Sequence, residues 1–357
     1  MKKILLAVVL ALVGWLLFWP VPIDPVAWQP PEAPRLEGRY ARNDRLQDVA
    51  LLARGTGTGG EDVVVDNEGH IYTGYADGRV VRLEPDGSKP DLLARTGGRP
   101  LGLDFDPQGR LIVADGYRGL LRIEASGAVT VLATEAHGRA FGFTNNVAVS
   151  DDGLIYFTDA SSKFGPERQA RDDILEHRGH GRLLRHNPDT GETRVLLRDL
   201  QFANGVALTP DQDAVLVAET GNYAILRYHL KGEREGEHEV LIENLPGLPD
   251  NIRSDGEDTI WIALYAPRNP ALDALAPWPF LRKMAFRLPQ AWQPQPAPHA
   301  FVLGMNPDGE ITHNLQYQGP DSYHPVTGVD QHDNRLYLGS LTHDALAVHE
   351  LPEDAAP

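Results

Sequence analysis

A unit of two apolar runs joined by a tight turn recurs six times along the chain, and this repetition constrains the fold more than any other feature. Most copies begin at a polar residue, and their turns are rich in Asn, Asp and Gly, as in β-hairpins whose turn residues need a positive φ. The copies span residues 61–75, 100–115, 145–160, 204–219, 250–265 and 326–341. The pattern therefore indicates paired strands arranged as a repeat.

Further short strands follow each pair, so the repeating unit has four strands. After the first copy these are "GRVVRLEP" and "DLLART". A four-stranded antiparallel sheet repeated radially predicts an all-β fold, a six-bladed β-propeller. A β-sandwich also has many short strands, but it gives no reason for one unit to recur. Residues 47–54 ("QDVALLAR") precede the first copy, and we expect them to complete the last sheet and close the ring.

The first strands of the blades line the central channel of a propeller, so their starts meet near the axis on one face. Side chains far apart in the sequence are then expected to converge there. The oxygen-bearing residues at these starts are Glu61, Asn145, Asn204, Asp250 and Asn251. The starts of the other two units, Pro100–Leu101 and Val326–Thr327, offer little to a metal ion.

Five oxygen donors without nitrogen or sulfur suit a hard cation, and two carboxylates balance the charge of Ca²⁺. Zn²⁺ prefers nitrogen or sulfur ligands, and Mg²⁺ usually keeps more water in a stricter octahedron. The alternative is that these Asn and Asp side chains only cap turns and satisfy backbone groups. Equivalent positions in the repeat favour a Ca²⁺ site.

The N-terminus predicts a membrane anchor over residues 1–23. Lys2 and Lys3 are followed by no charged residue from Ile4 through Ile23, enough to cross a hydrocarbon core of about 30 Å as a helix. A cleaved signal peptide is the alternative, although "WPVPIDP" offers no small-residue cleavage site. With the lysines inside, the rest of the chain is expected outside the cytoplasm. Residues 24–46 read as a linker, and residues 47–357 as the propeller.

Two stretches exceed the blade pattern, at residues 161–181 and 266–300. The first is polar and predicts a surface excursion near the channel. The second mixes apolar and basic side chains around "LDALAPWPFLRKMAFRL". It predicts either a helix on a membrane surface or over the channel, which would favour apolar substrates, or an ordinary helix packed on the blades.

Composition and missing motifs exclude several function classes. The net charge of −17 argues against nucleic acid as a partner. The absence of cysteine excludes disulfides, thiolate metal sites and a cysteine nucleophile. The chain has no G-x-S-x-G motif, no P-loop and no dinucleotide fingerprint.

Several segments resemble the strictosidine synthase-like branch of the senescence-marker-protein and gluconolactonase superfamily. They are "RPLGLDFDPQGRLIVADGYRGLL", "FANGVALTPD" and "LPDNIRSD", while "GGEDVVV", "FANG" and "PDNI" also resemble the paraoxonases. The likeness runs from about residue 47 to 351. It implies a six-bladed propeller with an axial catalytic calcium on the same five residues that the repeat indicates. It also implies hydrolysis of lactones, aryl esters or phosphotriesters, or, in one branch, formation of carbon–carbon bonds.

The chain departs from that family at three places. Thr327 stands where the alkaloid-forming enzyme has a glutamate, which disfavours the condensing activity. Tyr117, after Gly116, stands near the place of the paraoxonase histidine. A second, structural calcium of the paraoxonase type would fall to Asp62 and Asn146, and Asn146 replaces an acid there.

The sequence therefore predicts a membrane-anchored, Ca²⁺-dependent hydrolase of lactones or aryl esters, acting on a small and apolar substrate. Asp250 is the expected general base because the matching residue in the gluconolactonase-type enzymes is both ligand and base; alternatively it only ligates. His324 and Tyr117 are secondary catalytic candidates, and His332, in a turn, is expected to be solvated. The competing hypotheses are a non-catalytic binding propeller with a structural calcium and a strictosidine synthase-type condensing enzyme.

Overall fold

Six four-stranded antiparallel sheets form the body of the protein in the computed structural model, which describes residues 1–168 and 170–352. From inner to outer strand, the first three sheets are β2 (Val63–Val65), β3 (Ile71–Gly74), β4 (Arg79–Leu83), β5 (Asp91–Arg95); β6 (Pro100–Phe105), β7 (Leu111–Asp115), β8 (Gly119–Ile123), β9 (Val129–Ala133); and β12 (Thr144–Val149), β13 (Ile155–Asp159), β14 (Gly181–His186), β15 (Thr193–Leu200). The other three are β16 (Ala203–Leu208), β17 (Ala214–Glu219), β18 (Ala224–His229), β19 (His238–Ile242); β20 (Gly247–Ser254), β21 (Ile260–Pro267), β22 (Ala300–Met305), β23 (Ile311–Tyr317); and β24 (Gly328–His332), β25 (Arg335–Gly339), β26 (Leu346–Glu350), β1 (Ala50–Leu52).

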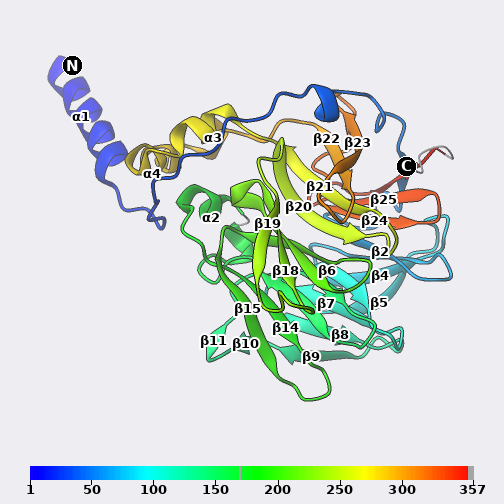
Figure 1. The fold of residues 1–357 in the computed structure, drawn as a ribbon. Coiled ribbons are helices and arrows are strands. Elements are labelled where there is room, and N and C mark those ends of the chain that lie inside the picture. Colours follow the sequence, from blue (N-terminus) through cyan, green and yellow to red (C-terminus); the bar gives the residue numbers. More distant parts are fainter. Residues whose placement is uncertain (169, 353–357) are drawn as a thin grey trace.

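The inner strands of neighbouring sheets contact one another in a closed ring, so the fold is the predicted six-bladed propeller (Figure 1). The ring closes as expected, because β1 from the start of the chain pairs with β26 in the last sheet, Ala50 opposite Val348. The small hairpin of β10 (Glu135–Ala136) and β11 (Arg139–Ala140) lies outside this pattern. The predicted boundary at residue 357 lies outside the described residues.

The hairpin turns follow from their sequences. The Asp66 carboxylate accepts the backbone N–H groups of Glu68 and His70 at 2.9 Å, and Asp106 does the same for Gln108 and Arg110. A glycine with φ of +83° or +73° follows three residues after each aspartate, a conformation that side-chain-bearing residues avoid. These turns set the register in which the apolar side chains of each strand alternate.

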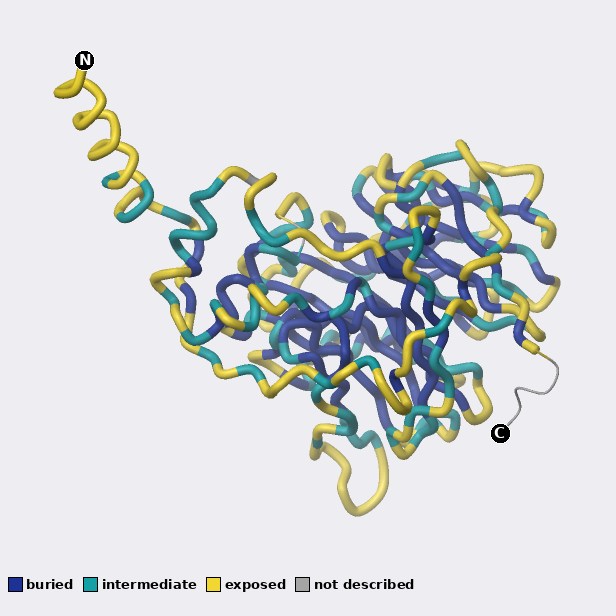
Figure 2. The backbone as a smooth tube through the Cα atoms, turned by 90° about the horizontal axis from the view of Figure 1, so that it is seen from above, coloured by how far each residue is buried: buried dark blue, intermediate teal, exposed yellow. Residues whose placement is uncertain are grey.

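Apolar side chains packed between neighbouring sheets form the core. The buried residues, dark blue in Figure 2, are concentrated inside the propeller. Val64 and Val80 of the first blade, for example, pack with Leu103 and Val113 of the second, and all four are buried. Their burial is the main stabilising contribution, at roughly 25 cal/mol per Å² of apolar surface. The sheets therefore hold the inner strands firmly around the axis.

The N-terminal helix α1 (Lys2–Phe18) projects from the propeller and buries none of its residues (Figures 1 and 2). The predicted membrane-spanning segment through residue 23 is not supported: no helix in the described part of the chain is long and apolar enough to cross a membrane. The helix stops early because Trp19 precedes Pro20 and adopts an extended ψ of 134°. Arg287 caps its end, donating to the carbonyls of Leu16 and Trp19 at 3.0 and 2.6 Å.

The two insertions supply the remaining helices, and both leave the propeller on the face where the inner strands start. The first holds η2 (Pro166–Arg168) and α2 (Arg171–Glu176); the second holds α3 (Pro270–Leu275), α4 (Pro279–Arg287) and η4 (Gln290–Trp292). Helices α2 and α4 contact each other, and Arg282 donates to the carbonyl of Leu175 at 2.9 Å. Two short turns elsewhere are η1 (Gly38–Tyr40) and η3 (Thr220–Asn222).

The segment predicted as a linker, residues 24–46, lies along the propeller. Trp28 stacks on His177 with ring centroids 4.0 Å apart, and Leu46 is fully buried. Arg268 donates to the carbonyl of Pro31 at 2.7 Å. This segment therefore ties α1 to the body of the protein.

Candidate metal and active site

Strand pairing is irregular at the starts of three inner strands, where four of the five predicted ligands lie. In β12, Thr144 pairs with Asp159 and the next pair is Val147 with Phe157, so Asn145 lies in a bulge. The same irregularity falls between Ala203 and Val206 in β16 and between Pro249 and Ile252 in β20, around Asn204, Asp250 and Asn251. Bulges re-aim side chains and interrupt pairing, which frees these polar residues from the regular alternation of the strands.

All five predicted ligands are buried and carry an oxygen without a donor. Their exposed fractions are only 2–4%. Each of the five has one side-chain oxygen without a hydrogen-bond partner in the described chain: Glu61 Oε2, Asn145 Oδ1, Asn204 Oδ1, Asp250 Oδ1 and Asn251 Oδ1. An unsatisfied buried oxygen costs about 1–3 kcal/mol, so this concentration at one end of the channel calls for a bound group.

Three buried threonines link the ligand-bearing strands across blades. Thr158 donates to the carbonyl of Asn204 at 2.6 Å, and Thr220 donates to the carbonyl of Pro249 at 2.7 Å. Thr327 donates to the carbonyl of Glu61 at 2.8 Å, while its own carbonyl accepts the N–H of Asn251 at 3.1 Å. These bonds join the third, fourth, fifth, sixth and first blades near the starts of their inner strands.

Glycine permits the closest approach between two of these strands. A Cβ on Gly205, next to Asn204, would lie 2.5 Å from the carbonyl oxygen of Asp250. No side chain fits at that distance, so the backbones of β16 and β20 meet directly.

The two acidic members of the set influence each other. Burial, with a smaller contribution from the charge of Asp62, raises the pKa of Glu61 to about 8, and the Arg99 charge opposes this. Burial also raises the pKa of Asp250 well above its usual range, and the Glu61 charge raises it further. The pKa of Tyr265 is raised by burial and then by the Asp250 charge, which places this tyrosine close to the site.

The donor set fits a hard divalent cation. It consists of two carboxylates and three amides, an all-oxygen set of the kind that Ca²⁺ takes. No group of three or more His, Cys, Asp or Glu side chains among the described residues is placed to hold a metal, so a site here depends on the amide oxygens. The unpartnered oxygens are the observation that makes the fit specific.

The secondary catalytic candidates do not join this cluster in any described contact. Tyr117 is 57% exposed, and its backbone N–H donates to Asp115 Oδ1 at 3.0 Å. The ring of His324 lies with Nδ1 2.8 Å from the carbonyl oxygen of Ser322. Both follow or precede strands on the ligand-bearing face, but the structure gives neither a contact with Asp250.

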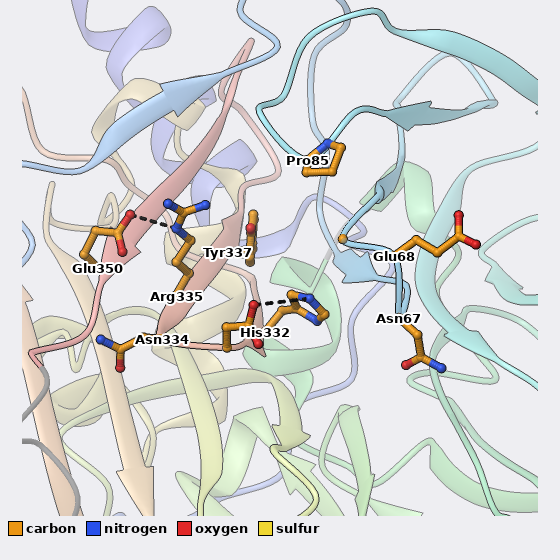
Figure 3. A pocket seen from close by; sticks show the side chains of 10 residues that line it. Asn67, Glu68, Pro85, His332, Asn334, Arg335, Tyr337 and Glu350 are labelled. Carbon is orange, nitrogen blue, oxygen red and sulfur yellow. Dashed lines mark hydrogen bonds and ion pairs between the residues drawn. The ribbon is translucent and has the colours of Figure 1, made fainter.

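A separate cavity of about 550 Å³ lies at the opposite end of the channel strands, between the turns that follow β2 and β24 (Figure 3). Its lining includes Glu68 and His332, and His332 contacts Asp333 there at 3.8 Å. Because these turns lie at the far ends of the inner strands, this cavity is no part of the candidate site.

Sequence reasoning missed the threonines and Arg99. Thr327 was recognised only as a departure from a glutamate, although it is fully buried and links three blades. Arg99 is also buried, and its Nη1 donates to the carbonyl of Gly59 at 2.9 Å. Neither type of residue carries a periodic signal, because its partner lies in another blade.

Comparison with known families gives two matches. The family model described as strictosidine synthase matches residues 145–233, and that described as strictosidine synthase-like, N-terminal, matches residues 38–83. Strictosidine synthase-like 6 of Arabidopsis thaliana is 42% identical over 317 residues, which cover 87% of this chain and 82% of that protein. Adipocyte plasma membrane-associated protein of Rattus norvegicus is 36% identical over 371 residues, covering 96% of each.

Solved structures share the fold at low identity. A gluconolactonase from Xanthomonas campestris superposes with a TM-score of 0.61 at 21% identity, covering 93% of this chain and 98% of its own. Regucalcin from Agrobacterium tumefaciens, described as a calcium-binding protein, gives a TM-score of 0.57 at 15% identity over 87% and 94% of the two chains. At these identities the likeness shows the propeller fold alone.

Proposed function

Since the chain belongs to the strictosidine synthase-like family, we propose that it is a calcium-dependent hydrolase that cleaves lactones or aryl esters at the axis of its propeller. The observation that carries the proposal is the set of five buried, unpartnered oxygens on two carboxylates and three amides. The names of the gluconolactonase and regucalcin neighbours agree with this chemistry.

Glu61, Asn145, Asn204, Asp250 and Asn251 would hold the calcium ion. When bound, such an ion polarises a carbonyl oxygen and favours negative charge on it. Asp250 then acts as general base: its carboxylate oxygen that does not hold the ion accepts a proton from the attacking water, and the proton passes to the leaving oxygen as the ester bond breaks.

The condensing activity has less support. Thr327 has no acid–base group, is fully buried and donates its hydroxyl to the Glu61 carbonyl. A threonine committed to a backbone bond cannot serve as the proton carrier that a glutamate would provide at that position. Hydrolysis therefore ranks above carbon–carbon bond formation.

The test is turnover of phenyl acetate and a panel of lactones by the calcium-loaded protein. We expect hydrolysis that is lost with a chelator and restored by Ca²⁺ but not by an equal concentration of Mg²⁺, since Mg²⁺ demands stricter octahedral geometry. Thermal unfolding measured alongside shows whether calcium binds. A protein that calcium stabilises but that turns over nothing above background would be a binding module with a structural ion.

We also propose that the protein associates with membranes through α1. This helix exposes Leu5 and Leu12 at 66% and 60%, and beside it the second insertion exposes Trp278 and Phe280 at 59% and 52%. Aromatic side chains of this kind favour the membrane interface. An apolar surface next to the ligand-bearing face also favours apolar substrates. The location of the propeller outside the cytoplasm stays a prediction.

Glutamate at both Leu5 and Leu12 is expected to abolish co-flotation of the full chain with neutral phosphatidylcholine vesicles, because each charge costs about 2.5–3.5 kcal/mol in an apolar layer. Val240→Glu is the matched control, since Val240 is 53% exposed on an outer strand of the propeller. Flotation that survives the double substitution, or is lost equally in the control, contradicts the assignment to α1.

A further inference from the structure

A single arginine occupies the channel below the candidate calcium site. Arg253 lies two residues after Asn251 in β20, where the regular pairing of the strand has resumed with Arg253 opposite Trp261. The Arg253 side chain is only 14% exposed. Its contacts with residues on the inner strands of other blades place it in the channel, farther along β20 than the proposed calcium ligands.

Carboxylates from three other blades surround its guanidinium group. Arg253 Nη2 lies 3.2 Å from Asp62 Oδ2, and Nη1 lies 3.4 Å from Asp104 Oδ1. Nε lies 3.5 Å from Asp330 Oδ1, and Nη2 also donates to the carbonyl of Leu103 at 2.6 Å. One cation thus links the fifth blade to the first, second and sixth.

Each of these carboxylates also binds the next blade. Asp62 accepts the N–H of Leu103 at 3.0 Å, Asp104 that of Val149 at 2.8 Å, and Asp330 that of Val65 at 2.8 Å. Burial raises the pKa of all three carboxyls, and the Arg253 charge is the largest influence that opposes it. Without a cation, the three carboxylates would place like charges together in a buried channel, which is strongly unfavourable.

The second calcium that the paraoxonase likeness implies does not fit these residues. Asp62 and the Leu103 carbonyl, the oxygens facing the channel at this level, are already bound to Arg253. Asn146, the other residue assigned to that ion, uses its Oδ1 to accept the N–H of Val206 at 3.0 Å. A divalent ion and the guanidinium cannot share these oxygens.

We propose that Arg253 is a built-in cation that takes the place of a second metal ion, so that the lower level of the channel is held together without calcium. With the guanidinium in place, the three carboxylates are too far apart to hold a metal ion. Once it is removed, they and the Leu103 carbonyl must move closer together to supply the oxygen ligands that a hard divalent ion needs. Arg253 therefore limits the channel to the one calcium of the proposed active site.

The test counts calcium ions per chain by equilibrium dialysis with elemental analysis, for the full chain and for three variants. Arg253→Lys keeps one positive charge and is the matched control, while Arg253→Ala and Arg253→Gln remove the charge and leave space. We expect about one more bound ion per chain in the Ala or Gln variant than in the Lys variant. We also expect the thermal midpoint of either neutral variant to fall without calcium and to recover with it.

The expected result is a difference in ion count between variants, so it can be distinguished from the outcome for the proposed function. If the unmodified protein binds no calcium, the active-site assignment fails, yet the neutral variants would still gain an ion over Arg253→Lys. An equal ion count in the Lys variant and in a folded neutral variant overturns the role of Arg253, as do two ions in the unmodified protein. Failure of both neutral variants to fold in millimolar calcium also counts against it, since a divalent ion would then not replace the guanidinium.

Discussion

Replacing Asp250 with asparagine is expected to lower turnover of a lactone or aryl ester by at least about 100-fold at saturating calcium, the lower range for loss of a general base. Asparagine keeps the shape of the side chain and an oxygen ligand, but it cannot accept a proton from water. Calcium should therefore still bind, although more weakly because one negative charge is lost. The measurement is kcat at saturating calcium, with the bound ion quantified in the same samples.

Glu61→Gln is the matched control for this substitution. It also converts a buried carboxylate ligand into an amide, so it weakens calcium binding in a similar way. Because Glu61 is assigned no proton transfer, its kcat should recover at saturating calcium while that of Asp250→Asn does not. Equal recovery of kcat in both variants would mean that Asp250 is only a ligand. An equal loss of kcat that persists at saturating calcium would show that both carboxylates act only through the ion.

The propeller and the family could be predicted because repetition multiplies a weak local signal. Each hairpin alone is ambiguous, but six copies of one four-stranded unit indicate one architecture. The position of residues 47–54 before the first copy indicated the closure that β1 and β26 make. The relatives confirm the family resemblance. Repeat position also selected the five candidate ligands, and the structure buries all five, each with an unpartnered oxygen.

Contacts between distant blades could not be predicted in this way. Arg253 resembles any charged residue near a strand end in "PDNIRSDG", and its carboxylate partners Asp62 and Asp104 lie 191 and 149 positions away. The end of α1 was overestimated for a different reason: hydropathy continues through Trp19 and Val21, whereas the prolines between and after them end the helix. Hydropathy describes whether a segment favours an apolar environment, whereas backbone geometry decides at which residue its helix ends.

Calcium affinity is expected to fall steeply as pH drops below about 8, because calcium and protons compete for Glu61 and Asp250. In the ion-free protein burial raises the pKa of Glu61 to about 8 and raises that of Asp250 above its usual range. Calcium needs both carboxylates ionised, so binding must release protons. For each proton that binding releases, the calcium affinity falls about tenfold with every unit of decrease in pH. Between pH 8 and pH 6 this amounts to about 100-fold per released proton.

The same shifts fix the sign of the stability change. Because both folded-state pKa values lie above the unfolded ones, the ion-free fold is favoured while these groups are protonated and loses stability as the pH rises. For Glu61 this loss falls between about pH 4.5 and about pH 8. Calcium should reverse this trend, since it holds the carboxylates ionised in the folded state.

Calorimetric titration in two buffers of different ionisation enthalpy counts the protons, and thermal unfolding with chelator or calcium reports the stability. Glu61→Gln should release fewer protons than the unmodified protein; calcium affinity that does not change between pH 6 and pH 8 would contradict the assignment of these two carboxylates as ligands.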